Sequence, residues 1–173
     1  MKKLLFTLML ALGPAVVVAA TPGEVAEGRK LREISMHGLT GETKALSTFL
    51  GKPLIINVWA SYCPPCLAEM GSLDRLSRMY RDRFNVIGVS IDDYRDRALR
   101  FLEQANTAFP HFIDHRLGIE NMLGANRIPL TVLVDADGRI LHKVYGARQW
   151  DAPDAVLAIE RAFGLGVGDG ERH

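Results

Sequence analysis

Cysteine is scarce in this chain of 173 residues, which contains only Cys63 and Cys66. Two cysteines allow one internal bridge, so the connectivity of any disulfide within the chain is not in question. A zinc site requires about four ligands, and none of the five histidines forms a spaced pair near the cysteines. The scarcity of ligands therefore weighs against a structural zinc centre.

The chain also lacks an excess of charge of either sign. Its 21 Lys and Arg residues and 20 Asp and Glu residues give a net charge of +1. This balance provides no strong attraction to nucleic acid or to a membrane surface, so we expect neither as a partner. The sequence shows no internal repeat, and its 48% hydrophobic and 24% charged residues are ordinary for a globular protein.

The first twenty residues have the composition of an export signal. Lys2 and Lys3 precede an uncharged apolar run from Leu4 to Val18, and small residues follow before Thr21. This order predicts a cleaved signal peptide over residues 1–20 and a periplasmic or otherwise exported protein. An uncleaved N-terminal anchor is the alternative, because about 17 apolar residues are just enough to span a bilayer.

Strand and helix patterns alternate along the rest of the chain. Continuous apolar runs at Leu54–Trp59 and Phe84–Ile91 are typical of strands that are covered on both faces. A helical pattern from Pro64 to about Tyr80 lies between them, and Thr131–Val134 followed by the turn Asp135–Gly138 predicts a hairpin. The order predicts an α/β domain with a central mixed sheet flanked by helices.

Shorter patterns predict the remaining elements. Short strands are expected at Leu31–Met36 and Lys44–Leu46, as a β extension before the first buried strand. Asp92 and Asp93 are expected at the N-terminus of a second helix, and Asp151 as the N-cap of the last helix.

The folded domain is expected over residues 31–164. We expect a flexible lead-in over residues 21–30, where Pro, Gly and Glu show no period, and a flexible glycine-rich tail over residues 165–173.

The two cysteines stand three residues apart, where the first buried strand meets the following helix. One helical turn brings positions i and i+3 to the same face, so the two sulfurs can meet. Cys63 is expected at the helix N-terminus, where free N–H groups and the helix dipole favour the thiolate. Cys63 would then attack a substrate disulfide, and Cys66, one turn inside the helix, would resolve the mixed disulfide.

Two prolines separate the cysteines. Pro64 and Pro65 suit the first helical turn and stiffen the loop. Neither has an N–H group, so the sulfur of Cys63 must draw its hydrogen bonds from the N–H of Cys66 and beyond.

Non-catalytic interpretations of the pair remain open. A structural disulfide would use the same two cysteines, but so short a loop removes little entropy from the unfolded chain. A module that holds a metal, or that presents the cysteines to an assembly partner, would need no turnover.

Three stretches together carry a family resemblance: Asn57–Glu69 with its Cys-Pro-Pro-Cys motif, Val89–Asp92, and Ile128–Gly138. They resemble the thioredoxin superfamily, and within it the exported TlpA/ResA-like branch that includes the DsbE/CcmG proteins of cytochrome c maturation. The resemblance covers about Leu31 to Phe163. It implies a thioredoxin fold with a strand-helix insertion near 92–124.

The resemblance also implies an activity. It points to a thiol-disulfide oxidoreductase with a redox-active Cys63–Cys66 pair and no cofactor or metal. We expect a monomer that reduces protein disulfides, in cytochrome c maturation or in envelope redox homeostasis. A membrane electron donor of the DsbD type would keep the pair reduced.

Individual residues receive roles from the resemblance. It implies that the Ile128–Pro129 peptide is cis and lies against the disulfide. The cis bond would expose the backbone of Ile128 for pairing with a substrate strand. An ordinary trans proline at the start of a strand is the alternative. Glu69 matches an acid found one turn after the second cysteine, whereas cytosolic thioredoxins carry a buried Asp where this chain has Asn57. Glu69 is thus either a proton relay to Cys66 or a solvated side chain on the helix surface.

Trp59 and Tyr62 are expected to support the site, although the chain departs from the family around it. Tyr62 replaces the usual Trp, Met70 stands where Pro is common, and Leu130 follows the proline where Thr is frequent. A thiol-dependent peroxidase on the same fold is the rival enzyme, but no T-x-x-C context surrounds Cys63.

Overall fold

The computed structural model describes residues 22–166. Its strands are β1 (Ser35–Gly38), β2 (Lys44–Ala45), β3 (Leu54–Trp59), β4 (Asn85–Ser90), β5 (His111–Ile113), β6 (Leu130–Val134) and β7 (Ile140–Tyr145). Its helices are α1 (Pro64–Met79), α2 (Arg95–Ala105), α3 (Gly118–Leu123) and α4 (Pro153–Phe163), with a 3-10 turn η1 (Leu46–Phe49). The predicted signal peptide and residues 167–173 of the predicted tail lie outside the described residues.

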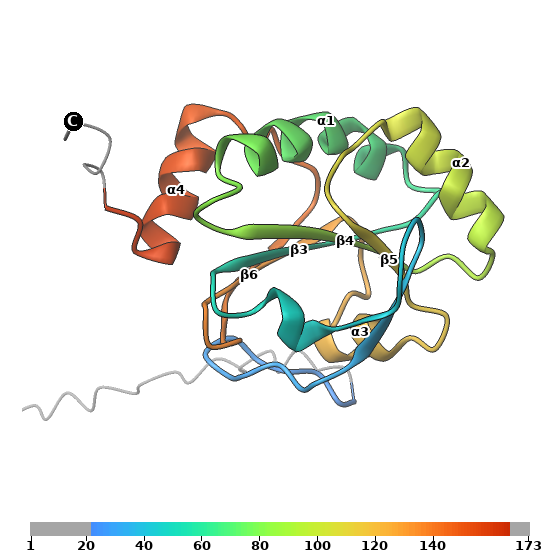
Figure 1. Ribbon diagram of the computed structural model, residues 1–173, viewed down its shortest axis with the longest axis horizontal. Helices are drawn as coiled ribbons and strands as arrows, with labels where there is room; N and C mark the ends of the chain where they lie inside the picture. The colour runs from blue at the N-terminus through green and yellow to red at the C-terminus, as the bar shows by residue number, and fades with distance from the viewer. Residues whose placement is uncertain (1–21, 167–173) are drawn as a thin grey trace, which may run out of the picture.

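The described strands form one mixed sheet in the order β2-β1-β5-β4-β3-β6-β7. Figure 1 shows α1, α2 and α4 over one face of this sheet and α3 on the other side. The predicted α/β class, with a central mixed sheet between helices, is confirmed. The elements α2, β5 and α3 fall within the insertion expected near 92–124.

β3 lies at the centre of the sheet and ends at the cysteine loop. It pairs in parallel with β4 and antiparallel with β6, and all its residues are buried. Alternate side chains enter opposite layers: Ile56 and Val58 join the hydrophobic cluster beneath α3, whereas Ile55 and Trp59 join the cluster beneath α1, α2 and α4. Burial on both faces explains why the sequence of this strand is nearly all apolar.

The predicted hairpin is confirmed, because β6 and β7 pair antiparallel across the turn at residues 135–138. The strand expected at Leu31–Met36 lies instead at Ser35–Gly38, since the N–H of Leu31 donates to the carbonyl of Gly138 in the turn between β6 and β7 at 2.8 Å. The strand expected at Lys44–Leu46 is present as Lys44–Ala45.

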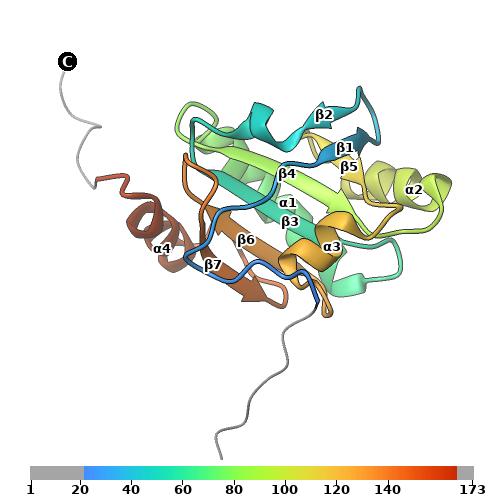
Figure 2. The same cartoon turned by 90° about the horizontal axis from the view of Figure 1, so that it is seen from below.

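Residues 22–30 are packed onto the domain and differ from the flexible lead-in that the sequence predicts. Val25 is only 6% exposed, and its N–H donates to the carbonyl of Met122 at 2.8 Å. Gly28 and Arg29 exchange backbone hydrogen bonds with Ile140 along the outer edge of β7. Figure 2 shows this segment crossing the face of the sheet that carries α3. The segment therefore covers a sheet edge that would otherwise have unpaired backbone groups.

The helix starts predicted from acidic residues are wrong. Asp92 and Asp93 both precede α2, whose N-cap is Tyr94. The N-cap of α4 is Ala152, without a side-chain hydrogen bond, whereas Asp151 binds Arg75 of α1. Tertiary contacts thus occupy carboxylates that local pattern alone assigns to helix ends.

His111 at the start of β5 is a buried neutral imidazole. It is 4% exposed, and its Nε2 lies 2.8 Å from the hydroxyl of Thr107. The ring packs against Trp59, and the missing side chain of Gly88 leaves room for it, because an added Cβ there would collide with Nδ1 of His111. Burial lowers the pKa of His111 to about 3.

This burial predicts that acid weakens the fold. The pKa of His111 is about 3 in the folded protein and about 6.5 in an unfolded chain. As the pH falls below about 6.5, the unfolded chain binds a proton that the folded protein does not bind until about pH 3. The free energy of unfolding should therefore fall by up to about 1.4 kcal/mol per pH unit through this residue.

Urea unfolding of the wild type and of His111→Gln at several pH values measures this slope. The variant lacks the titrating ring, so its stability should change less between about pH 6 and pH 4. His142→Gln, at an exposed position, serves as the control and should keep the wild-type slope. Parallel curves for His111→Gln and the wild type would show that His111 does not cause the effect.

Candidate redox site

Cys63 and Cys66 form a disulfide at the start of α1, with their Cα atoms 5.3 Å apart. Cys63 is the N-cap of the helix, and the two prolines occupy the first positions after it. The N–H of Cys66 donates to Sγ of Cys63 at 3.2 Å, as the missing N–H groups of the prolines predict. A thiolate at Cys63 would receive the same bond and the positive end of the helix dipole.

The two sulfur-bearing residues differ in access. Cys63 is 7% exposed, whereas Cys66 is completely buried. The neighbouring Tyr62 is 68% exposed and extends the surface beside Cys63. An incoming thiol or disulfide would therefore meet Cys63 first, with Cys66 behind it.

Trp59, which the sequence analysis expects to support the site, is completely buried at the end of β3. Its ring stacks on Phe101 of α2 with the centroids 4.4 Å apart. Trp59 belongs to the hydrophobic cluster that also contains both cysteines.

The Ile128–Pro129 peptide is cis, which confirms the conformation that the family resemblance implies. Pro129 is buried, and Ile128 is half-buried against the hydrophobic cluster that contains both cysteines. The carbonyl of Pro129 accepts a hydrogen bond of 2.9 Å from the N–H of Gly146, just after β7. The turn before β6 is thus held beside the layer that carries the disulfide.

Glu69 lies one turn after Cys66 and is buried, with 1% exposure. Its Oε1 accepts a bond of 2.7 Å from Nδ2 of Asn57, and its Oε2 accepts bonds of 2.9 Å from Nε1 of Trp150 and 3.1 Å from the N–H of Arg148. The alternative of a solvated surface carboxylate is therefore wrong. Asn57 also donates to the hydroxyl of Thr131 at 3.0 Å, so the carboxyl belongs to a buried polar group between β3, β6 and α1.

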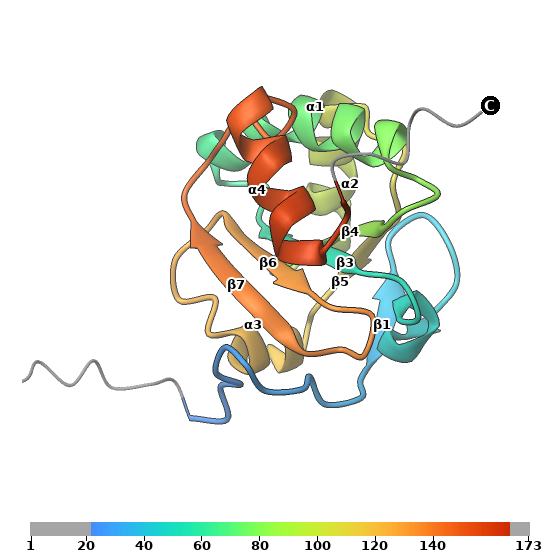
Figure 3. The same ribbon diagram turned by 90° about the vertical axis from the view of Figure 1, so that its left-hand side faces the viewer.

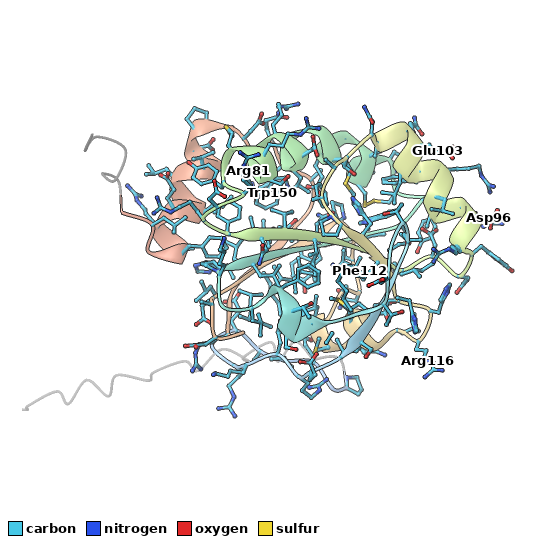
Figure 4. All side chains as sticks on the ribbon, in the orientation of Figure 1. Arg81, Asp96, Glu103, Phe112, Arg116 and Trp150 are labelled. Carbon is cyan, nitrogen blue, oxygen red and sulfur yellow. A yellow bond between two sulfur atoms is a disulfide. The ribbon has the colours of Figure 1, made fainter. Side chains whose placement is uncertain are left out.

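The loop between β7 and α4 covers Glu69. The chain leaves β7 and runs up to α1 before it enters α4 (Figure 3), and the side chain of Trp150 projects between these helices (Figure 4). The hydroxyl of Ser72 in α1 accepts a bond from the N–H of Trp150 at 3.0 Å, which fixes the loop on the helix. Arg148 and Trp150 are partners of Glu69 that the sequence did not predict.

Burial raises the pKa of Glu69, and the hydrogen bonds from Trp150, Asn57 and the backbone of Arg148 lower it, offsetting part of that effect. A carboxyl with a raised pKa can take and release protons closer to neutral pH than an exposed glutamate can. Its position at i+3 from Cys66 places it on the same side of the helix.

Within residues 22–166, no cluster of three or more His, Cys, Asp and Glu side chains could hold a metal ion. None of the helices in that range is long and apolar enough to cross a bilayer.

Comparison with known sequences identifies a family. Residues 26–159 match the family model described as Redoxin. The chain is 29% identical to the thiol-disulfide oxidoreductase ResA of Halalkalibacterium halodurans, over 66% of this chain and 65% of that protein. It is 32% identical to the thiol:disulfide interchange protein DsbE of Vibrio cholerae, over 77% of this chain and 74% of that protein.

Solved structures share the fold. A protein from Chlorobium tepidum, described as a DsbE thiol:disulfide interchange protein, gives a TM-score of 0.73 at 26% identity, covering 80% of this chain and 98% of that one. StoA from Bacillus subtilis gives a TM-score of 0.60 at 20% identity, covering 68% of this chain and 90% of that one, which shows likeness of fold alone.

Proposed function

The chain belongs to the redoxin family, among the relatives of the ResA and DsbE oxidoreductases, and from this premise we propose that it is an exported reductase of protein disulfides. Its reaction uses Cys63 and Cys66. The observation that carries the proposal is the disulfide at the N-terminus of α1, in which Cys63 keeps 7% exposure and Cys66 is completely buried.

The reaction begins with the pair reduced. The thiolate of Cys63 attacks one sulfur of a substrate disulfide, so that a mixed disulfide forms and the other substrate sulfur leaves as a thiolate. Cys66 then loses its proton to Glu69 and attacks Sγ of Cys63. The second substrate thiolate leaves, and the Cys63–Cys66 disulfide forms. Two electrons have passed from the pair to the substrate, and its two thiolates become thiols by taking one proton from Glu69 and one from water.

The substrate is a protein rather than a small disulfide. The cis Ile128–Pro129 turn packs against the cluster that holds the disulfide, and its Ile128 backbone is the proposed pairing edge for a substrate strand. Tyr62 offers an exposed aromatic surface next to Cys63.

Export and partners follow from the N-terminal sequence and from the direction of electron flow. The charged and apolar pattern of residues 1–20 supports export, with cytochrome c maturation or envelope redox homeostasis as the setting. A reductase in an oxidising compartment requires a source of electrons, for which we propose a membrane donor of the DsbD type acting on a monomer.

An insulin reduction assay tests the proposed activity. In the presence of dithiothreitol, the protein without its first twenty residues should accelerate precipitation of the insulin B chain over a protein-free control. The same preparation should consume hydrogen peroxide no faster than dithiothreitol alone. Insulin reduction at the protein-free rate would contradict the proposal, and rapid peroxide consumption would favour a peroxidase instead.

A further inference from the structure

Asp92 is a buried carboxylate that the proposed exchange does not use. It follows β4 and is 3% exposed. Its Oδ1 accepts the hydroxyl of Ser61 at 2.6 Å, and its Oδ2 accepts the N–H of Ser61 at 2.9 Å and the hydroxyl of Ser90 at 2.7 Å. Burial of a carboxylate is unfavourable unless hydrogen-bond donors satisfy its oxygens. These three donors, of which Ser61 supplies two, offset that cost for Asp92.

Ser61 lies within the short connection between Trp59, the last residue of β3, and Pro64, the first of α1. The end of β3 is fixed, because the carbonyl of Trp59 accepts the N–H of Ile91 at 2.9 Å. Within the connection, Tyr62 is mostly exposed and the N–H of Cys63 donates to the carbonyl of Ala60 at 3.2 Å. The contacts of Ser61 with Asp92 therefore anchor the connection two residues before Cys63.

This anchor matters differently in the two redox states. In the oxidised protein the disulfide itself ties Cys63 to Cys66, and the connection is held at both ends. In the reduced protein that covalent tie is absent, and the contacts between Ser61 and Asp92 would be left to hold the connection. Loss of the anchor would give the connection more conformational freedom in the reduced protein than in the oxidised protein, where the disulfide still restrains it. The gain in conformational entropy would therefore favour the reduced state.

We propose that Asp92 is a positioning residue for thiol-disulfide exchange, which acts through Ser61 to hold Cys63 at the N-terminus of α1 when the pair is reduced. A dithiol held in this way closes more readily to the disulfide and is the stronger reductant. This inference rests on the proposed redox function of the pair.

The test is the equilibrium of the protein with glutathione, in which protein dithiol and oxidised glutathione give protein disulfide and two molecules of reduced glutathione. Ser61→Ala removes the hydroxyl donor and leaves the charge of Asp92 in place. Its equilibrium constant should fall by about two- to tenfold, the factor that corresponds to the loss of one hydrogen bond, because the N–H of residue 61 still donates to Oδ2 of Asp92. Alkylation of free thiols followed by mass spectrometry measures the oxidised fraction.

Three further variants isolate the anchor. Ser61→Thr keeps a hydroxyl and should stay close to the wild-type constant. Ser77→Ala removes a hydroxyl that binds the carbonyl of Asp74 within α1 and should leave the constant unchanged. Asp92→Asn should shift the equilibrium in the same direction as Ser61→Ala, because it replaces one acceptor oxygen with an NH₂ group. Urea unfolding of each oxidised variant checks that it folds.

The outcomes separate this inference from the proposed function. If the wild type titrates with glutathione and Ser61→Ala has the same constant, the positioning role is wrong and the redox function stands. If the wild-type pair does not exchange with glutathione at all, the proposed function fails and this inference fails with it.

Discussion

Replacing Cys63 with serine is expected to lower insulin reduction by at least about 10³-fold, to the protein-free background. The hydroxyl of serine does not ionise at neutral pH and forms no bond with a disulfide sulfur, so the first step of exchange cannot occur. The N-cap position itself should tolerate the change, because serine is a favoured N-cap residue. A loss of activity would thus reflect chemistry rather than unfolding.

Cys66→Ser is the matched control for this prediction. It keeps the attacking thiol and removes the buried one, so a mixed disulfide with the substrate should accumulate and turnover should stop. Mass spectrometry under non-reducing conditions detects that adduct. If Cys63→Ser instead formed the adduct and Cys66→Ser did not, the roles of the two cysteines would be reversed.

Glu69→Gln should slow exchange by about 10²-fold at neutral pH, the lower end of what general acid-base catalysis contributes. The amide cannot accept the proton of Cys66, so the resolving step lacks its base. The rate of disulfide formation from the isolated mixed disulfide measures that step directly. Glu103→Gln changes an exposed carboxylate on α2 (Figure 4) and should leave the rate unchanged.

Trp150→Phe distinguishes a proton relay from a merely structural role of Glu69. The indole N–H binds Oε2 of Glu69 and lowers the pKa of this carboxyl, so its removal should raise that pKa further. A base must be deprotonated to act, so the rising limb of the pH–rate profile should move to higher pH. An unchanged profile in Trp150→Phe, together with wild-type rates in Glu69→Gln, would contradict the relay.

The central part of the site could be predicted from the sequence because its determinants are local. The spacing of Cys63 and Cys66, the apolar run of β3 before them and the helical period after them all lie within one short stretch. The donation from Cys66 to Sγ of Cys63 follows from the missing N–H groups of two prolines. The cis conformation of Pro129 came from the resemblance and not from the residues themselves.

The surroundings of Glu69 could not be predicted in this way. The periodicity of α1 does not show what covers each position, and Trp150 is separated from Glu69 by 81 residues of sequence. The same limit applies to Asp92, which local pattern places at a helix end although it binds Ser61, 31 residues away. Buried carboxylates are satisfied by whichever donors the tertiary fold supplies, and those donors leave no period in the sequence.

The ionisation of Cys63 tests the central claim most directly, and it is measured by the rate of alkylation of the fully reduced protein across a pH series. The account predicts that Cys63 reacts as a thiolate with a pKa clearly below the value of about 8.5 for free cysteine, while Cys66 stays unreactive in the folded protein. An inflection at or above about 8.5, or equal reactivity of both thiols, would contradict it.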